Sequence, residues 1–166
     1  LNAYEYQGGN GIRISEEKAR NIGFEAKMYD IELSIHAPYY ISFASSEKEK
    51  RENSIMYIMQ SLQAAQWMDA KRVVFHPGSV GKMSRPRAME LALEIMPRVI
   101  RAQDERGFGS IELCPEVMGK INQLGTVDEI IELCKLDDRL IPTVDFGHVN
   151  ARTQGGLKAK EDFARV

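Results

Sequence analysis

Three histidines, the only ones in the chain, occupy similar places along it and could bind a metal ion. His36 is the last residue of the apolar run Ile31–His36, and His76 is the last residue of Arg72–His76. His148 lies just after a third run of this kind, and we expect none of the three to lie on a helix. A single histidine at a strand end is usually structural, but three in equivalent places indicate a site. Neutral imidazole is a common ligand of zinc and of other transition metals.

Two carboxylates join the histidines. Glu116 ends the predicted strand Ser110–Glu116, and Asp145 ends Leu140–Asp145. The four strand-end residues are separated by 40, 40 and 29 positions, which suits consecutive strand–helix units. A buried carboxylate is costly unless it binds a cation or a donor. Imidazoles and carboxylates together therefore favour a Zn²⁺, Mn²⁺ or Fe²⁺ site over a metal-free hydrogen-bonded pocket. Glu112 is the competing ligand, but it lies in the N-terminal half of its strand.

The elements that must position these residues alternate along the chain. Short runs rich in Ile, Val, Leu, Phe or Tyr predict strands at Ala3–Gln7, Ile31–His36, Arg72–His76, Ser110–Glu116 and Leu140–Asp145. Helices are predicted from Ser15 to about Tyr29, from a Ser46–Glu49 capping box to about Met68, from Ser84 with Pro97 inside, from a Thr126–Glu129 capping box through Cys134, and after Gly155–Gly156. This alternation predicts a parallel sheet, in either a doubly wound fold or a TIM barrel.

Composition limits the class of protein. Hydrophobic residues make up 43% and charged residues 28% of the chain, as in a globular protein with a core. No apolar run approaches the roughly 20 residues that span a bilayer, and no signal-peptide layout opens the sequence, so we expect a cytoplasmic protein with no membrane partner. Cys114 and Cys134 lie in apolar stretches and are predicted to be buried thiols. The net charge of −2 argues against a broad basic DNA-binding face, although a local basic rim is compatible with it.

Four segments resemble the motifs of one known family. They are His36-Ala-Pro-Tyr-Tyr-Ile-Ser-Phe-Ala-Ser45, Val73-Val-Phe-His-Pro-Gly-Ser79, Pro115-Glu116 with Gly119 and Leu124-Gly125 after it, and Val144-Asp-Phe-Gly-His148. The middle of the chain is similar to the endonuclease IV type of apurinic/apyrimidinic endonuclease, within the xylose isomerase-like TIM barrels. The resemblance implies an α/β fold, here a partial parallel (β/α) TIM barrel of about five strand–helix units. We expect residues 1–166 to form a single domain that lacks the first and last strands, or to self-associate through the open barrel edges.

The resemblance also implies up to three Zn²⁺ ions, with Mn²⁺ as the alternative ion. His36, His76 and Glu116 would hold one ion. Glu116, the catalytic candidate, would bridge to a second ion with Asp145, and His148 would help to hold a third. The implied reaction is metal-assisted phosphodiester hydrolysis in DNA repair, on DNA whose abasic nucleotide is turned out of the duplex. Later strands supply further ligands in the family, so residues 1–166 alone are expected to be inactive.

Three residues are candidates for substrate binding. Tyr39 and Tyr40 match positions at which the family presses residues into the duplex, although tyrosines after Pro38 would also cover the barrel mouth. Arg152 follows His148 on the same predicted loop. Its guanidinium could clamp a phosphate or could be an ordinary surface charge.

Two departures from the family leave a second function open. The loop Gln7–Arg13 is short and glycine-rich where the family carries a DNA-probing segment, and Glu116 is followed by Val-Met in place of Asn-Thr. The alternative is a sugar isomerase or epimerase of the same barrel superfamily, which would use one divalent metal and acid–base carboxylates. A third hypothesis is a metal-binding protein without catalysis.

Overall fold

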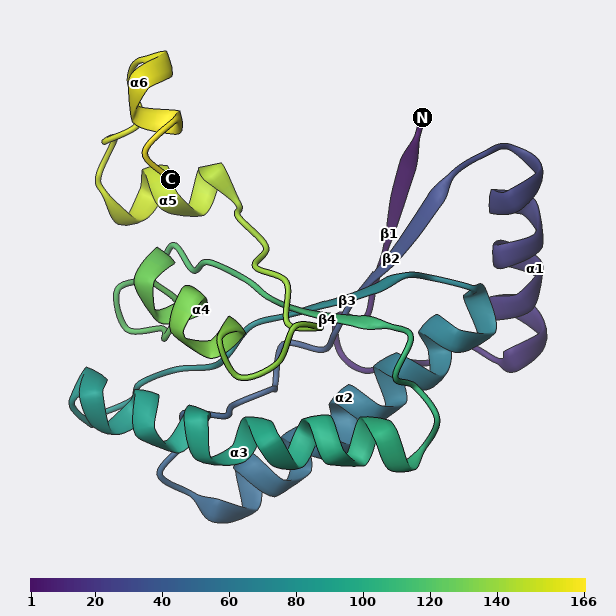
Figure 1. Cartoon of the computed structure of the whole chain (residues 1–166), viewed down its shortest axis with the longest axis horizontal. Coiled ribbons are helices and arrows are strands. Elements are labelled where there is room, and N and C mark those ends of the chain that lie inside the picture. Colours follow the sequence, from purple (N-terminus) through teal and green to yellow (C-terminus); the bar gives the residue numbers. More distant parts are fainter.

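Strands and helices alternate over most of the chain (Figure 1). The structure is a computed structural model that describes residues 1–166. Its strands are β1 (Ala3–Gln7), β2 (Glu32–His36), β3 (Arg72–Phe75) and β4 (Glu112–Pro115). Its helices are α1 (Glu16–Met28), α2 (Lys48–Met68), α3 (Arg85–Glu105), α4 (Val127–Cys134), α5 (Phe146–Arg152) and α6 (Lys160–Phe163).

The four strands form one parallel sheet in chain order, β1-β2-β3-β4. His36 pairs with Val74 and Val74 pairs with Cys114, so the C-terminal ends of β2, β3 and β4 lie together at one edge of the sheet. Parallel neighbours require a crossover, and a helix makes each one here. The prediction of a parallel α/β fold in a partial barrel is confirmed, with four regular strands.

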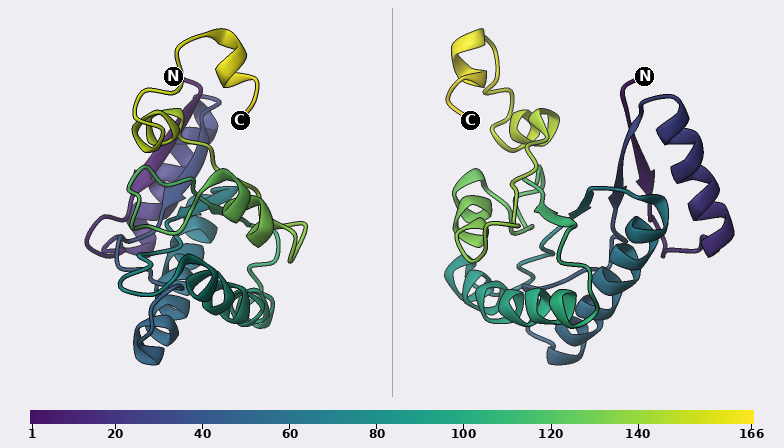
Figure 2. Two further views of the ribbon diagram at one scale, coloured as in Figure 1. Left: turned by 90° about the vertical axis from the view of Figure 1, so that its left-hand side faces the viewer. Right: turned by 45° about the vertical axis from the view of Figure 1, so that its right-hand side comes forward.

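Helices cover one face of the sheet. Figure 2 shows α1, α2, α3 and α4 following one another around the outer side of the strands. Alternate strand residues point to that side, where Ile35, Val73, Phe75 and Leu113 are fully buried in the main apolar core. His36 belongs to the opposite set, so its side chain points to the face that the helices leave free.

Side-chain hydroxyls cap the N-termini of three helices. They accept backbone N–H groups of the first turn from the N-cap positions of α1, α3 and α4, which are Ser15, Ser84 and Thr126. Glu129 completes the predicted capping box of α4. The predicted Ser46–Glu49 box of α2 is wrong, because Glu47 is the N-cap and makes no side-chain cap hydrogen bond. Helix α3 runs through Pro97, and no helix of the chain is long and apolar enough to cross a membrane.

The predicted fifth strand, Leu140–Asp145, is reduced to two isolated parallel bridges with the β4 segment, one of which joins Thr143 to Glu116. The N–H groups on either side of Pro142 both donate to carbonyls of β4. Pro142 therefore faces away from β4, on an open edge where its missing N–H breaks no ladder. Helix α5, which the sequence did not predict, follows directly, and the helix predicted after Gly155–Gly156 is the short α6.

Both cysteines are free thiols. Cys114 on β4 is 1% exposed, and Cys134 at the end of α4 is partly buried. Burial raises the pKa of Cys114 to about 12 and that of Cys134 to about 11, because the thiolate would lose its hydration. Both groups are therefore protonated at neutral pH. The prediction of a buried thiol is confirmed for Cys114, whereas Cys134 is only partly buried.

Candidate metal centre

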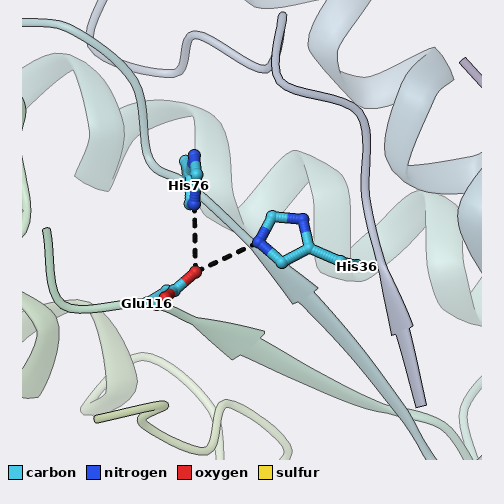
Figure 3. Close-up of side chains that lie close together, drawn as sticks. All are labelled: His36, His76 and Glu116. Atoms are coloured by element: carbon cyan, nitrogen blue, oxygen red, sulfur yellow. Dashed lines mark hydrogen bonds and ion pairs between the residues drawn. The ribbon is translucent and has the colours of Figure 1, made fainter. Parts of the chain in front are cut away.

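Glu116 lies at the centre of the candidate site, where three imidazoles meet its carboxylate. The Nε2 atoms of His36 and His76 lie 3.1 and 3.0 Å from Glu116 Oε2 (Figure 3). On the other side, Nδ1 of His148 lies 3.2 Å from Glu116 Oε1. The side chain of Glu116 is only 8% exposed. Four of the five residues predicted from strand-end positions therefore converge on one point.

The parallel sheet explains why residues so far apart in sequence meet. His36 is the last residue of β2, whereas His76 and Glu116 each follow directly after the last residue of their strands. In adjacent parallel strands these positions lie at the same end of the sheet. His76 and Glu116 each lie two residues beyond the strand residues that are in register with His36, so all three side chains point to the helix-free face. Glu112 lies at the opposite end of β4, where it pairs with Arg72 at 2.7 Å and takes no part in the cluster.

The hydrogen bonding of His36 shows that the cluster suits a cation. Its Nδ1 lies 2.9 Å from the carbonyl oxygen of Ala37, to which an Nδ1–H would donate. A neutral ring with that proton carries a lone pair on Nε2, which faces the Glu116 carboxylate. Two such acceptors face each other favourably only with a proton or a cation between them. A carbonyl that fixes the far nitrogen is also the usual second partner of a metal-bound imidazole.

The pKa values of the same residues show the charge that the site holds. Burial favours the neutral carboxyl of Glu116, but hydrogen bonds from His36 and His76 outweigh it and lower the pKa of Glu116 to about 2. Burial likewise favours the neutral ring of His36, but its hydrogen bonds with Glu116 and with the Ala37 carbonyl, together with the negative charge of Glu116, outweigh this and raise the pKa of His36. The carboxylate of Glu116 is therefore anionic at neutral pH and could serve as an oxygen ligand.

Asp145 and His148 form a second group around the same carboxylate. Asp145 is the N-cap of α5, and its Oδ1 accepts the backbone N–H of His148 at 2.9 Å. The expectation that no site histidine lies on a helix is wrong for His148, which sits in the first turn of α5. His148 Nδ1 lies 2.9 Å from the Val117 carbonyl and 3.8 Å from Asp145 Oδ2. Ligand atoms of Glu116, Asp145 and His148 are close enough to one another to share an ion, as are those of His36, His76 and Glu116.

A pocket of about 580 Å³ opens beside the histidines. Its lining includes Tyr39, His76 and His148. The ring of Tyr39 stacks on that of His76, with centroids 5.7 Å apart, and the side chain stays largely exposed. Tyr40 packs instead edge-on against Tyr57 of α2 and does not line this pocket. The two tyrosines predicted to bind substrate are thus separated by the fold, and only Tyr39 faces the pocket.

The remaining wall of the pocket is the β4–α4 loop, residues 117–125, which the sequence did not single out for substrate binding. Lys120 and Gln123 are the polar side chains that it contributes. The signal available in the sequence was their place directly after Glu116, because loops after parallel strands line the site in such folds. Arg152 contacts the backbone of this loop, since its Nη1 donates to the carbonyls of Met118 and Lys120 at 2.9 and 3.0 Å. Its predicted phosphate contact stays a prediction.

Comparison with known proteins matches the chain to one family. The family model of the xylose isomerase-like TIM barrel matches residues 2–165. An uncharacterized protein of Methanocaldococcus jannaschii is 31% identical over 168 residues, which cover 100% of this chain and 59% of that protein. A protein of Thermoplasma volcanium named "Probable endonuclease 4" is 37% identical over 73 residues, 43% of this chain and 26% of that protein. The chain therefore spans less than two thirds of the length of these relatives.

Two solved structures show the same fold at low identity. A D-tagatose 3-epimerase-like protein has a TM-score of 0.77 and 22% identity, with 94% of this chain and 60% of that chain covered. Endonuclease IV from Thermus thermophilus has a TM-score of 0.64 and 19% identity, with 93% of this chain and 62% of that chain covered. The barrel architecture is shared by both kinds of enzyme.

Proposed function

This chain belongs to the xylose isomerase-like TIM barrel family, and from that premise we propose that it is part of a zinc-dependent phosphodiesterase that cleaves DNA at abasic sites. The observation that carries the proposal is the convergence of three imidazole nitrogens on the single carboxylate of Glu116 within 3.0 to 3.2 Å. A site rich in nitrogen donors with few carboxylates suits zinc better than magnesium or calcium. The curated relatives named endonuclease 4 support the choice of reaction.

The donor set divides into two parts that share Glu116. His36 and His76 would hold one ion with Glu116 Oε2, and Asp145 and His148 would hold another with Oε1. Binding through His148 Nδ1 would require this nitrogen to give up the proton that it directs at the Val117 carbonyl. Bound divalent zinc would supply Lewis-acid polarisation of a phosphodiester and would lower the pKa of a bound water. Mn²⁺ would satisfy the same donors.

Other groups of the chain would orient the histidines and bind the substrate. The carbonyl of Ala37 holds the ring of His36 with Nε2 towards the site, and the Asp145 cap holds the backbone of His148. Tyr39 stacks on His76 at the pocket, where its exposed ring offers a surface for a nucleotide turned out of the duplex. In this proposal Glu116 anchors the catalytic ions, and Tyr39 contributes to substrate binding.

The experiment uses the full-length protein, with its bound metal measured by elemental analysis. The substrates are a duplex carrying one abasic site, the same duplex without it, and a panel of ketoses. Two or more zinc ions per chain with nicking only of the abasic duplex would support the proposal. One Mn²⁺ or Mg²⁺ per chain with no nicking would refute it.

A sugar isomerase or epimerase is the second candidate, because one donor group is more complete than the other. His36, His76 and Glu116 are buried or nearly so, whereas the side chain of Asp145 is 44% exposed and already caps α5. A single well-held ion would suit the isomerase or epimerase of one divalent metal that the sequence left open. Interconversion of ketoses in the same assay, with one ion bound, would select this candidate.

A further inference from the structure

The pocket beside the histidines has an unbalanced charge on one wall. Lys120 lines this pocket, and no aspartate or glutamate is among the lining residues. The ammonium group of Lys120 makes no ion pair or side-chain hydrogen bond with the protein, and the residue is exposed. The other polar member of that wall, Gln123, is uncharged. A lysine that lines a pocket and has no carboxylate partner favours an anionic ligand there.

Two arginines hold the loop that carries Lys120. Arg152 on α5 donates from Nη1 to the carbonyl oxygen of Lys120 itself at 3.0 Å. From the other side, Arg85 on α3 donates to the carbonyl oxygens of Ile121 and Gln123 at 2.8 and 3.1 Å. The backbone on both sides of Lys120 is therefore fixed by charge-assisted hydrogen bonds, which lowers the entropy lost when the loop binds a ligand.

The two guanidinium groups also leave the loop in a positive environment. Glu129 is the one carboxylate that pairs with Arg85, with 2.6 Å between Arg85 Nη2 and Glu129 Oε2, and Arg152 pairs with no carboxylate. Burial lowers the pKa of Arg152, and the nearby positive charge of Arg85 lowers it further, because a like charge disfavours the protonated guanidinium. Since both arginines are committed to backbone carbonyls, Lys120 is the cation in this part of the structure with all its donors available.

We propose that Lys120 binds a phosphate group of the substrate in the pocket beside His76 and His148. The inference rests on the proposed phosphodiesterase function and deepens it, because it assigns the substrate anion to a residue outside the donor set. A lysine is a compact cation with three rotatable donors, which suits a phosphate oxygen without demanding a fixed geometry. Phosphate could reach the pocket as a diester within DNA or as a free monoester, and the pocket chemistry is the same for both.

The test compares Lys120→Gln and Lys120→Arg with a matched control, Lys82→Gln. Lys82 is a lysine of the β3–α3 loop that lines a different pocket, so the control removes the same charge elsewhere. The full-length, zinc-loaded protein is titrated by calorimetry with methyl phosphate, with neutral trimethyl phosphate, and with a duplex carrying a tetrahydrofuran abasic analogue. Bound zinc and the melting temperature are measured for every variant.

Lys120→Gln is expected to weaken binding of a phosphate ligand by roughly ten- to a hundredfold, the range for one hydrogen bond to a charged group. Lys120→Arg should recover most of it, Lys82→Gln should bind within about twofold of the unsubstituted protein, and trimethyl phosphate should not bind. Weakening confined to methyl phosphate would identify the source as a free phosphate ester, and weakening confined to the duplex would identify it as DNA.

Two results would overturn the inference. One is unchanged binding of both phosphate ligands by Lys120→Gln relative to Lys82→Gln. The other is loss of zinc or of thermal stability in both Lys120 variants, which would show a purely structural role. A protein that binds methyl phosphate through Lys120 but never nicks abasic DNA would contradict the proposed function and leave this inference standing.

Discussion

Replacing Glu116 by glutamine tests the centre of the site directly. The substitution keeps the size and shape of the side chain but removes the anionic oxygens that both donor groups share. Loss of an outer partner of a metal ligand typically weakens metal binding by 10- to 100-fold. Because Glu116 contacts all three imidazoles itself, Glu116→Gln should weaken zinc binding by more than about a hundredfold, or roughly 2.7 kcal/mol.

The assay is zinc affinity by competition with a chelator, together with metal content after dialysis. The matched control is Glu112→Gln, which removes the same charge from the same strand at its opposite end, where Glu112 pairs with Arg72. We expect the control to retain zinc, and both variants to keep the helical circular dichroism of the unsubstituted protein. Full metal content in Glu116→Gln would refute the assignment of the site, as would equal losses in the two variants.

Three further predictions concern stability and accessibility. The ion pair and backbone hydrogen bonds of Glu129 outweigh its burial and lower its pKa, so its carboxylate stabilises the fold above about pH 4.5 and loses that effect at lower pH. Urea unfolding should therefore show that Glu129→Gln is about 1–3 kcal/mol less stable than the unsubstituted protein at pH 7, with a smaller difference at pH 3.5. Gly78→Ala, which puts a Cβ 2.6 Å from a neighbouring loop's backbone at φ +109°, should lower the unfolding free energy by more than 2 kcal/mol, and more than Gly81→Ala, where no atom lies within 4 Å of the added Cβ; equal losses would contradict the steric argument. Cys114 is 1% exposed, and burial raises the pKa of Cys134 to about 11, so neither should react with a disulfide reagent at pH 8 until the protein is unfolded, and rapid labelling of the folded protein would show that the core opens.

Local patterns in the sequence were sufficient for the sheet and most of the helices. Runs of β-branched and aromatic residues predicted the four strands to within a few residues, because such side chains pack well in a buried parallel sheet. The Thr126–Glu129 capping box could also be predicted, because its two partners lie only three residues apart in the sequence. The box predicted at Ser46 failed because the backbone there enters the helix one residue later, at Glu47.

The sequence also determined which residues could form a site. Parallel strands place their C-terminal ends at one edge, so a polar residue at each strand end must lie near the others whatever the loops do. That rule alone brings together His36, His76 and Glu116. It also excludes Glu112, which lies at the opposite end of its strand and pairs with Arg72. Their convergence follows from topology, which is why it could be predicted before any coordinate was known.

Only the tertiary structure decided what surrounds that site. Arg152 contacts carbonyls 32 and 34 residues away in the chain. Such a contact cannot be predicted from the periodicity or the spacing of residues in the sequence. The structure placed His148 on a helix, turned Tyr40 away from the pocket, and left Lys120 facing it. These outcomes depend on how loops pack against one another, because loop conformation is set by long-range hydrogen bonds and close contacts rather than by local propensity. The candidate ligand set was therefore determined by the sequence, and the side chains that line the pocket beside it were determined by the fold.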